Sequence, residues 1–322
     1  MTPYPGSLPT IPGYAWRPLQ AGDVAALQRL EQDCAPLDGV TIFRSAAEWA
    51  AVVAEAAFSQ TAVSPAGEIA AVGWLTLEDR VDSVHAFHFG RVQPQFRGQG
   101  IGRALLGWLE AAAVPRLQEM ADGRPAFLRT YFYDREPQTI GLLLRSGYER
   151  QYAEDELRLD LRQTGPTAVL RAETAVFPWT TANAGDFYAV YRAAFASRTA
   201  SLLDAAAWAN HFANPDDDEF RPHLSRIVQQ DGAPVAYAVV YVEGTEPETA
   251  WISQMGVHQA YRRQGLGRAL LLEMVSGLAA AGYRQAALSV NVDNPQARAL
   301  YEQVGFRLRR RLSVYRKAVV GG

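Results

Sequence analysis

Two glycine-rich segments carry residue types that suit the binding of a phosphate group. They cover residues 97–106 and 262–271, and eight of their ten positions are identical. Each segment follows an apolar, strand-like run and begins an apolar, helix-like run. Glycine lets the backbone approach a ligand closely, and the first N–H groups of a helix carry a partial positive charge. The sequence therefore predicts two copies of one anion-binding strand–loop–helix unit.

The residues expected to contact the anion correspond one to one in the two copies. In the second copy they are Arg262, Arg263, Gln264, Gly265, Leu266, Gly267 and Arg268. In the first copy they are Arg97, Gly98, Gln99, Gly100, Ile101, Gly102 and Arg103. Neither copy has the glycine spacing of the dinucleotide fingerprint or the Gly-Lys-Ser/Thr of the Walker loop. A plain strand–turn–helix corner, with glycines needed only for packing, is the alternative.

A second segment, residues 288–306, carries groups that can hold or donate a proton. Asn294 is a favourable N-cap, and Pro295 suits the first position of a helix. Tyr301 follows Asn294 by seven residues, close to two turns, so both lie on one side of the predicted helix. The alternative interpretation of Tyr301 is a half-buried ring that packs under Phe306.

These motifs together resemble the GNAT acyl-CoA-dependent N-acetyltransferases. Arg-x-x-Gly-x-Gly occurs in both loops and resembles motif A of that family, and residues 288–306 resemble its motif B. The tandem arrangement is similar to mycothiol synthase and related two-domain acetyltransferases. The resemblance covers nearly the whole chain. It implies acetyl-CoA as the cofactor, with its pyrophosphate at the glycine loop.

The resemblance also implies roles for residues in the second half. Tyr301 matches the general acid of the family, and Asn294 matches a polar contact on the cofactor side. A phenol with a pKa near 10 can donate a proton to a leaving thiolate with a pKa near 8.5. Met255, Gly256 and Val257 match the splayed strand whose backbone groups bind the oxyanion and the pantetheine arm.

The first half departs from motif B. Aligned on its terminal glycine, it has Leu143 where the second half has Tyr301, and Glu136 where the second half has Asn294. Leucine cannot donate a proton. We therefore expect the first half to be catalytically impaired, although its loop and the strand end at Val92 could still hold CoA.

The general base is left open by the sequence. Residues 250–257 include no glutamate, whereas Glu243, Glu246 and Glu248 lie just upstream. One of these three could act through a water molecule. Each is also consistent with a solvated loop charge.

Other candidate groups lie in the first half. His85 and His88 are three apart on a predicted strand and so on opposite faces, which argues against a metal site. We expect one of them to line the acyl cleft. Tyr131 and Tyr133, on the next strand, could substitute for the missing acid.

Two charged runs have a functional and a structural interpretation. Residues 216–219 are four consecutive acids, which suit attraction of a cationic amine or an exposed turn. Residues 309–311 are three arginines on the last strand, which we interpret as an exposed strand or a domain contact.

Composition limits the class of protein. The 322 residues carry a net charge of −3, which gives no field that attracts nucleic acid or acidic membranes. Cys34 is the single cysteine, so no disulfide framework is expected. No apolar run is long enough to span a membrane, and the N-terminus lacks a signal peptide pattern. We expect a cytoplasmic monomer or homodimer that acts on a small molecule.

Local signals predict helix ends. Residues 45–48 match a capping box, and the helix after the first loop is expected to run through about residue 113. Gly147 and Gly305 are expected to end the last helix of each half.

The periodicity predicts an α/β fold, with a mixed sheet, repeated in two tandem domains. The expected domains are residues 1–163 and 164–322, joined by a connector at 162–176. Each half is expected to end on a closing strand, at 150–161 and 307–317. The expected reaction is transfer of an acetyl group from acetyl-CoA to a primary amine in the second half. The alternatives are a CoA-binding sensor or scaffold without turnover, and a protein N-terminal acetyltransferase.

Overall fold

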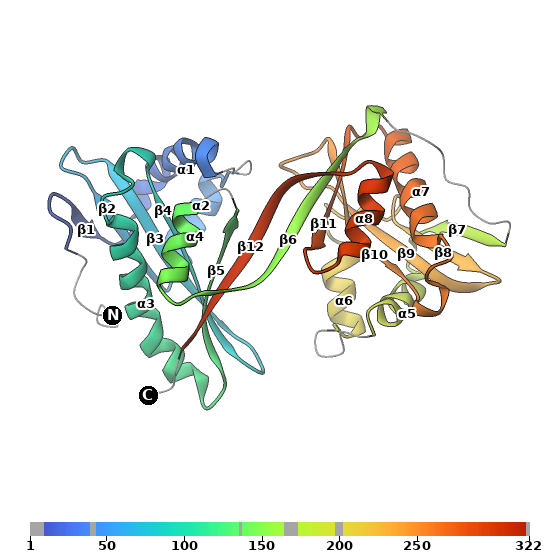
Figure 1. The fold of residues 1–322 in the computed structure, drawn as a ribbon, viewed down its shortest axis with the longest axis horizontal. Coiled ribbons are helices and arrows are strands. Elements are labelled where there is room, and N and C mark those ends of the chain that lie inside the picture. Colours follow the sequence, from blue (N-terminus) through green and yellow to red (C-terminus); the bar gives the residue numbers. More distant parts are fainter. Residues whose placement is uncertain (1–9, 39–42, 135–136, 164–172, 197–201, 320–322) are drawn as a thin grey trace. The chain divides into compact units, whose positions relative to one another are not determined.

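The chain forms two compact units, each described here by itself. The computed structural model describes residues 10–38, 43–134, 137–163, 173–196 and 202–319. Unit 1 comprises Met1–Ala153 with Arg311–Gly322, and unit 2 comprises Glu154–Arg310. Both are built of helices packed on a mixed sheet, which confirms the expected fold class (Figure 1).

Unit 1 has strands in the order β1-β2-β3-β4-β5-β12, of which only the pair β4–β5 is parallel among these described strands. The strands are β1 (Ala15–Arg17), β2 (Phe58–Val63), β3 (Ile69–Asp79), β4 (Val84–Val92), β5 (Ala126–Tyr133) and β12 (Arg307–Val319). The α-helices are α1 (Val24–Asp38), α2 (Ala46–Glu55), α3 (Ile101–Ala121) and α4 (Pro137–Arg145).

Unit 2 repeats the arrangement, with strands in the order β6-β11-β10-β9-β8-β7 and a parallel pair at β10–β11. The strands are β6 (Glu149–Asp160), β7 (Thr174–Pro178), β8 (Arg226–Gln230), β9 (Ala233–Tyr241), β10 (Thr249–Val257) and β11 (Gln285–Asn291). The α-helices are α5 (Ala184–Ala194), α6 (Ala205–Phe212), α7 (Leu266–Ala280) and α8 (Pro295–Val304).

Each sheet is buried on both faces because its strands alternate apolar residues between two helical layers. In β9, Val240 joins the cluster that packs with α7 and α8, whereas its neighbour Val239 joins the cluster with α5 and α6. In unit 1, Ala71 of β3 packs with α3, and Val72 packs with α1 and α2. This period of two is what a strand imposes on its side chains.

Helix boundaries follow local capping. Ser45 and Glu48 form the predicted capping box: the Ser45 hydroxyl accepts from the Glu48 N–H at 3.2 Å, and Glu48 accepts from the Ser45 N–H at 2.6 Å. Helix α3 runs to Ala121, beyond its expected end near residue 113, and continues through Pro115. The short strands β2 and β7 were not predicted, and β7 begins inside the expected connector.

The closing strands pair differently from the expectation. Residues 312–319 of β12 pair antiparallel with β5 in unit 1. Residues 154–160 of β6 pair antiparallel with β11 in unit 2. The units therefore do not divide at 163/164, because each half of the chain gives its closing strand to the other half. Strand pairing uses backbone groups that every residue carries, so alternation predicts a strand without naming its partner.

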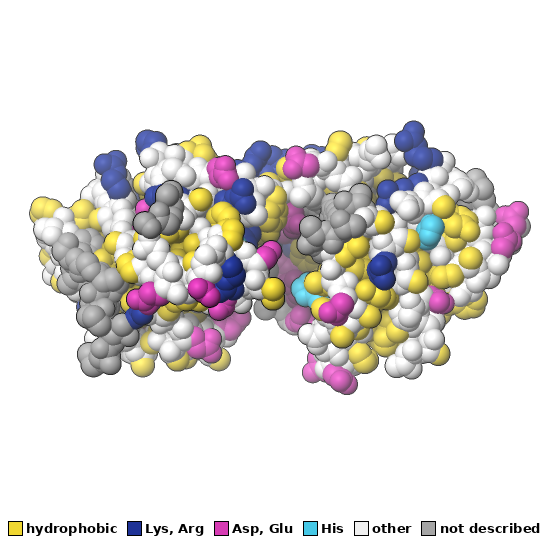
Figure 2. Space-filling model, turned by 90° about the horizontal axis from the view of Figure 1, so that it is seen from below, with side chains coloured by type: hydrophobic (Ala, Val, Ile, Leu, Met, Phe, Trp, Pro, Cys, Tyr) yellow, Lys and Arg dark blue, Asp and Glu magenta, His cyan; other side chains and the backbone are white. Residues whose placement is uncertain are grey.

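Charges of both signs occur over each unit on the face that Figure 2 shows, so neither unit presents a surface of one sign there. No helix among the described residues is long and apolar enough to cross a membrane.

Candidate active site

The parallel strands of unit 2 diverge. Strands β10 and β11 pair only over residues 249–251 and 285–287. Beyond that point β10 continues along β9, and β11 continues along β6. Unit 1 has the same divergence, because β4 and β5 pair over residues 84–87 and 126–129 and then separate. One edge of the second half of β10 therefore faces the opening between the two strands.

Two backbone donors of β10 are directed to this opening. The N–H of His258, just after the strand, donates to the Val235 carbonyl on the β9 side at 2.8 Å. Because successive N–H groups of a strand point to opposite edges, those of Met255 and Val257 point toward β11. The predicted segment 255–257 thus lies where an extended ligand can pair with the strand.

The glycine loop places a helix N-terminus at the same end of the opening. Gly265 is the N-cap of α7, with φ +83° and no side chain to satisfy the first N–H groups. A Cβ at Gly265 would have no heavy atom within 4 Å, so the space above its backbone is open. Gly100 has the same place in α3, with φ +84°. Both loops therefore fit an anion held by backbone N–H groups.

The last glycine of each loop is explained by packing. A Cβ on Gly267 would lie 3.5 Å from both Val257 and Leu300. A Cβ on Gly102 would lie 3.6 Å from Val92 and 3.9 Å from Leu142. The two helices α8 and α4 are therefore seated equivalently, which supports the alignment of residue 301 with residue 143.

The first arginine of each loop binds carbonyl groups of its own unit. Arg262 donates from Nε to the Val257 carbonyl at 3.3 Å and from its guanidinium to the Ala194 carbonyl. Arg97 donates in the same way to the Val92 carbonyl at 2.9 Å and forms an ion pair with buried Asp38 at 2.8 Å. Both arginines fasten the loop to the strand end.

The other polar residues of the second loop differ from this pattern. Arg263 and Arg268 are exposed. Arg263 has φ +64°, a left-handed conformation that the first copy gives to Gly98. Gln264 is partly buried. All three arginines of this loop are exposed, and Arg262 differs from Arg263 and Arg268 in that it also donates to backbone carbonyl groups.

Tyr301 lies on α8 and packs, partly buried, against the unit 2 core. Its ring centroid is 6.2 Å from that of Phe306, which agrees with the packing interpretation but leaves the hydroxyl group unexplained. Burial raises the pKa of Tyr301 to about 12, so the phenol stays protonated at neutral pH. In unit 1 the aligned Leu143 is buried in the core and has no proton to give.

Asn294 is the N-cap of α8, and its Oδ1 accepts from the Ala297 N–H at 3.2 Å. Its established contact is therefore structural. The aligned position in unit 1, Glu136, lies outside the described residues.

Gly256 packs so closely against its neighbours that a side chain has no room there. A Cβ there would lie 2.7 Å from the Tyr237 ring and 3.0 Å from Ala194. Next to it, the Gln254 side-chain carbonyl accepts from Trp208 at 2.8 Å and from the Tyr237 hydroxyl at 2.5 Å. Sequence reasoning missed Gln254, although an amide side chain inside an apolar strand is a signal that it has buried partners.

The three upstream glutamates differ in their surroundings. Glu246 forms an ion pair with Arg158 at 2.8 Å, and Glu248 forms an exposed pair with Arg284 at 3.2 Å. Burial and the neighbouring carboxylates raise the pKa of Glu243.

The two charged runs differ in the contacts that their residues make. Within residues 216–219, the Glu219 carboxylate accepts from the Gly244 N–H at 3.0 Å, which ties the run to the loop after β9. Within residues 309–311, Arg310 is buried and pairs with buried Glu156. Of the two interpretations of this run, the exposed strand is therefore wrong at Arg310, whose burial is compensated by an ion pair with β6.

Unit 1 has a cleft of about 640 Å³ at its own loop. Its walls include the loop, the end of β4 and helix α4, together with His88, one of the two histidines considered for the acyl cleft. His88 is buried and its Nε2 lies 2.8 Å from the Tyr148 hydroxyl. Burial, with the positive charge of Lys317, lowers the pKa of His88 to about 3, so the ring is neutral. Cys34 is buried nearby, and burial raises its pKa to about 11, which disfavours a nucleophilic thiolate.

Comparison with known proteins identifies the family. Residues 187–306 match the acetyltransferase (GNAT) family model. The mycothiol acetyltransferase of Geodermatophilus obscurus is 30% identical over 305 residues, which cover 89% of this chain and 92% of that protein. The chain belongs to the GNAT acetyltransferases. It is a GNAT-family N-acetyltransferase with two tandem GNAT units.

Other relatives agree with this assignment. The mycothiol acetyltransferase of a Nocardioides species is 27% identical over 289 residues, 81% of this chain and 94% of that protein. Among solved structures, a GCN5-related N-acetyltransferase from Sphaerobacter thermophilus has a TM-score of 0.77 at 22% identity and covers 98% of both chains. A tandem GNAT protein from the clavulanic acid biosynthesis pathway has a TM-score of 0.66 at 19% identity, covering 96% of this chain and 99% of that one. These two structures share the tandem fold.

Proposed function

We propose that this N-acetyltransferase uses acetyl-CoA as its donor and acetylates the primary amine of a small molecule, with the chemistry in unit 2. The observation that carries the proposal is that Tyr301 of α8 and Leu143 of α4 occupy equivalent places in the two units. Only the unit 2 residue can protonate a leaving group. The mycothiol acetyltransferases among the relatives make a mycothiol-type acceptor the first candidate.

The residues around the loop fit a diphosphate. The open space above Gly265 and the uncapped N-terminus of α7 suit a group with many acceptor oxygens. The backbone N–H groups of Leu266, Gly267 and Arg268 would hold it, with exposed Arg263 as a further charge. Acetyl-CoA, when bound, supplies an acetyl thioester whose sulfur leaves as a thiolate.

The remaining groups act on the acyl transfer. The N–H groups of Met255 and Val257 stabilise the negative charge that develops on the thioester oxygen. Tyr301 donates its proton to the leaving sulfur. Glu243, with its raised pKa, is the preferred acceptor for the proton of the attacking amine, through water.

The proposal is tested by replacing Tyr301. A panel of amines, including the acceptor of mycothiol acetyltransferase, is first screened with acetyl-CoA by release of free thiol. With the best acceptor, Tyr301→Phe should lower kcat by about 10²-fold or more, because general acid catalysis typically contributes 10²–10⁴. Acetyl-CoA binding should remain within about twofold, since the ring is retained. Leu143→Ala, at the aligned core position of unit 1, is the control and should not reduce kcat specifically. Full turnover by Tyr301→Phe would remove the assigned role.

A further inference from the structure

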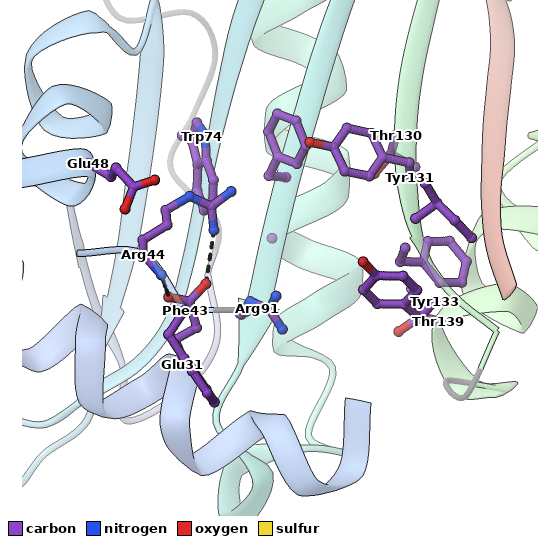
Figure 3. A pocket seen from close by; sticks show the side chains of 14 residues that line it. Glu31, Phe43, Arg44, Glu48, Trp74, Arg91, Thr130, Tyr131, Tyr133 and Thr139 are labelled. Carbon is purple, nitrogen blue, oxygen red and sulfur yellow. Dashed lines mark hydrogen bonds and ion pairs between the residues drawn. The ribbon is translucent and has the colours of Figure 1, made fainter. Parts of the chain in front are cut away.

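Unit 1 contains a second cavity that the reaction proposed for unit 2 does not use. Its volume is about 380 Å³, within the range of roughly 300–1,000 Å³ for small-molecule sites. We call it the aromatic chamber. Its walls include Trp74, Phe89, Tyr131, Phe132, Tyr133 and Leu312. Figure 3 shows Trp74 and Arg44 on one side and Tyr131 and Tyr133 on the other.

The aromatic chamber adjoins the cleft at the glycine loop of unit 1. Four residues line both cavities: Gly90, Arg91, Thr130 and Thr139. Gly90 and Thr130 lie on β4 and β5 just beyond the point where these strands stop pairing. A Cβ on Gly90 would lie 3.4 Å from Leu105 of α3 and 3.7 Å from the Val72 carbonyl, so packing disfavours a side chain at this shared position. A thioester held along β4 would therefore direct its acyl group toward the chamber.

Three charged residues of the chamber have ion-pair partners, and the fourth, Glu48, is exposed and accepts from the Ser45 N–H at 2.6 Å. Buried Glu31 accepts from the Arg44 N–H and guanidinium, both at 2.9 Å, and from the Trp49 indole at 3.2 Å. The Arg44 guanidinium also lies over the rings of Trp49 and Trp74, 5.1 and 5.3 Å from their centroids. Arg91 contacts Asp38 at 3.3 Å. Because a buried charge needs a partner, these pairs favour a neutral, apolar group over a charged one.

The stacked rings give that group a matching surface. Trp74 and Phe89 stack with centroids 5.2 Å apart, and Tyr131 meets Phe89 edge to face at 5.2 Å. At the aligned place in unit 2, Gly256 packs directly against Tyr237, which is fully buried with Trp208. On this face, unit 2 has no room for a side chain at Gly256, whereas unit 1 has the aromatic chamber.

We propose that unit 1 binds an acyl-CoA whose acyl group is neutral, apolar and larger than acetyl, such as an aromatic acyl group, and seats it in the aromatic chamber. Leu143 supplies no acid, so unit 1 holds this thioester without transferring its acyl group. The inference rests on the proposed use of CoA thioesters, but not on the chemistry of unit 2.

The test compares phenylacetyl-CoA with acetyl-CoA by calorimetric titration of the full-length chain. Arg268→Glu reverses an exposed charge at the unit 2 loop and confines tight binding to unit 1. In this variant phenylacetyl-CoA should bind at least about tenfold more tightly than acetyl-CoA. The matched variant Arg103→Glu, at the unit 1 loop, should abolish the preference.

A chamber variant locates the preference. Tyr131 is 43% exposed, so Tyr131→Asp should fold while placing an unpaired charge against the acyl group. In the Arg268→Glu background it should weaken phenylacetyl-CoA about tenfold and change acetyl-CoA by less than about twofold. Tyr131→Phe should keep the preference, since it keeps the ring.

Two outcomes would overturn the inference: equal affinity for both thioesters in Arg268→Glu, or a preference that survives Tyr131→Asp. Release of phenylacetate or transfer of its acyl group by unit 1 would overturn the claim that the thioester is held unreacted. Failure of acetyl-CoA to bind to Arg103→Glu would instead count against the proposed function of unit 2.

Discussion

Single residues distinguish two units that share one backbone plan. Tyr301 and Leu143 occupy equivalent places on α8 and α4, yet one carries a dissociable proton and the other does not. The position and burial of such a residue determine its pKa, and neither can be seen in the sequence. Sequence analysis selected Tyr301 from its motif, and its catalytic role stays a prediction. It could not foresee that Arg262 turns to carbonyl groups, because an arginine suits a carbonyl as well as a phosphate.

The raised pKa of Tyr301 gives a pH prediction. A general acid must be protonated, and burial moves the loss of this proton from near pH 10 to about pH 12. The kcat of the wild-type chain should therefore show no fall between about pH 8 and 10 that depends on Tyr301. The measurement is the pH profile of thiol release for wild type and Tyr301→Phe. An alkaline fall below about pH 10, present in wild type and absent in the variant, would contradict the role.

Whole elements were predicted where local chemistry determines them. The capping box at Ser45 and the glycines at 147 and 305, both with positive φ, marked helix ends correctly. Strand β7 was missed because it is five residues long and adjoins a segment with turn-forming residues. The end of α3 was misplaced because Pro115 lies inside the helix rather than after it. Tertiary packing, which sequence patterns do not contain, compensates the missing hydrogen bond.

The packing of β10 against the side of the sheet covered by α5 and α6 gives a stability prediction. Gly256→Ala would place a Cβ 2.7 Å from Tyr237, which is held by its hydrogen bond to Gln254. We expect a loss of about 1–3 kcal/mol in the free energy of unfolding of unit 2, typical of overpacking. Urea unfolding combined with hydrogen exchange of β9 and β10 measures it.

A second glycine serves as the control for this variant. In Gly277→Ala, in α7, the nearest atom to the new Cβ is Arg226 Nη2 at 3.7 Å, an ordinary contact. This change should be neutral or stabilise by up to about 1 kcal/mol. If both variants had the same stability as wild type, Gly256 would not be required by its neighbours.

At the scale of the whole molecule, the internal repeat predicted two units but not their exact composition. The closing segments 154–160 and 312–319 both have the alternating pattern of a strand. The sequence does not show which half of the chain each segment pairs with. Side-chain contacts accompany the observed pairing: Tyr315 of β12 stacks on Phe132 at 5.1 Å, and Lys317, the only lysine, pairs with Glu110 at 2.8 Å. These contacts fix β12 in unit 1.

Deleting the chain after Arg310 should therefore damage the distant half. The deletion removes the strand paired with residues 126–133 and should raise amide exchange along β5 by at least about tenfold. Exchange along β10 should change little, because its partners β9 and β11 remain. Ala318→Ser, at an exposed position of the same strand, is the control. Unchanged protection of β5 after the deletion would show that β12 does not support unit 1.

The exchange of closing strands also sets the order in which the two halves can be completed during synthesis. Unit 2 is continuous from residue 154 to residue 310 and has every strand it needs before the end of translation. Unit 1 is translated first, but its last strand comes from residues 311–319. The usual sequence, in which the N-terminal domain matures first on the ribosome, is therefore reversed. Until residues 312–319 have been translated and have paired, β5 presents an unpaired edge that a chaperone can cover or another chain can join.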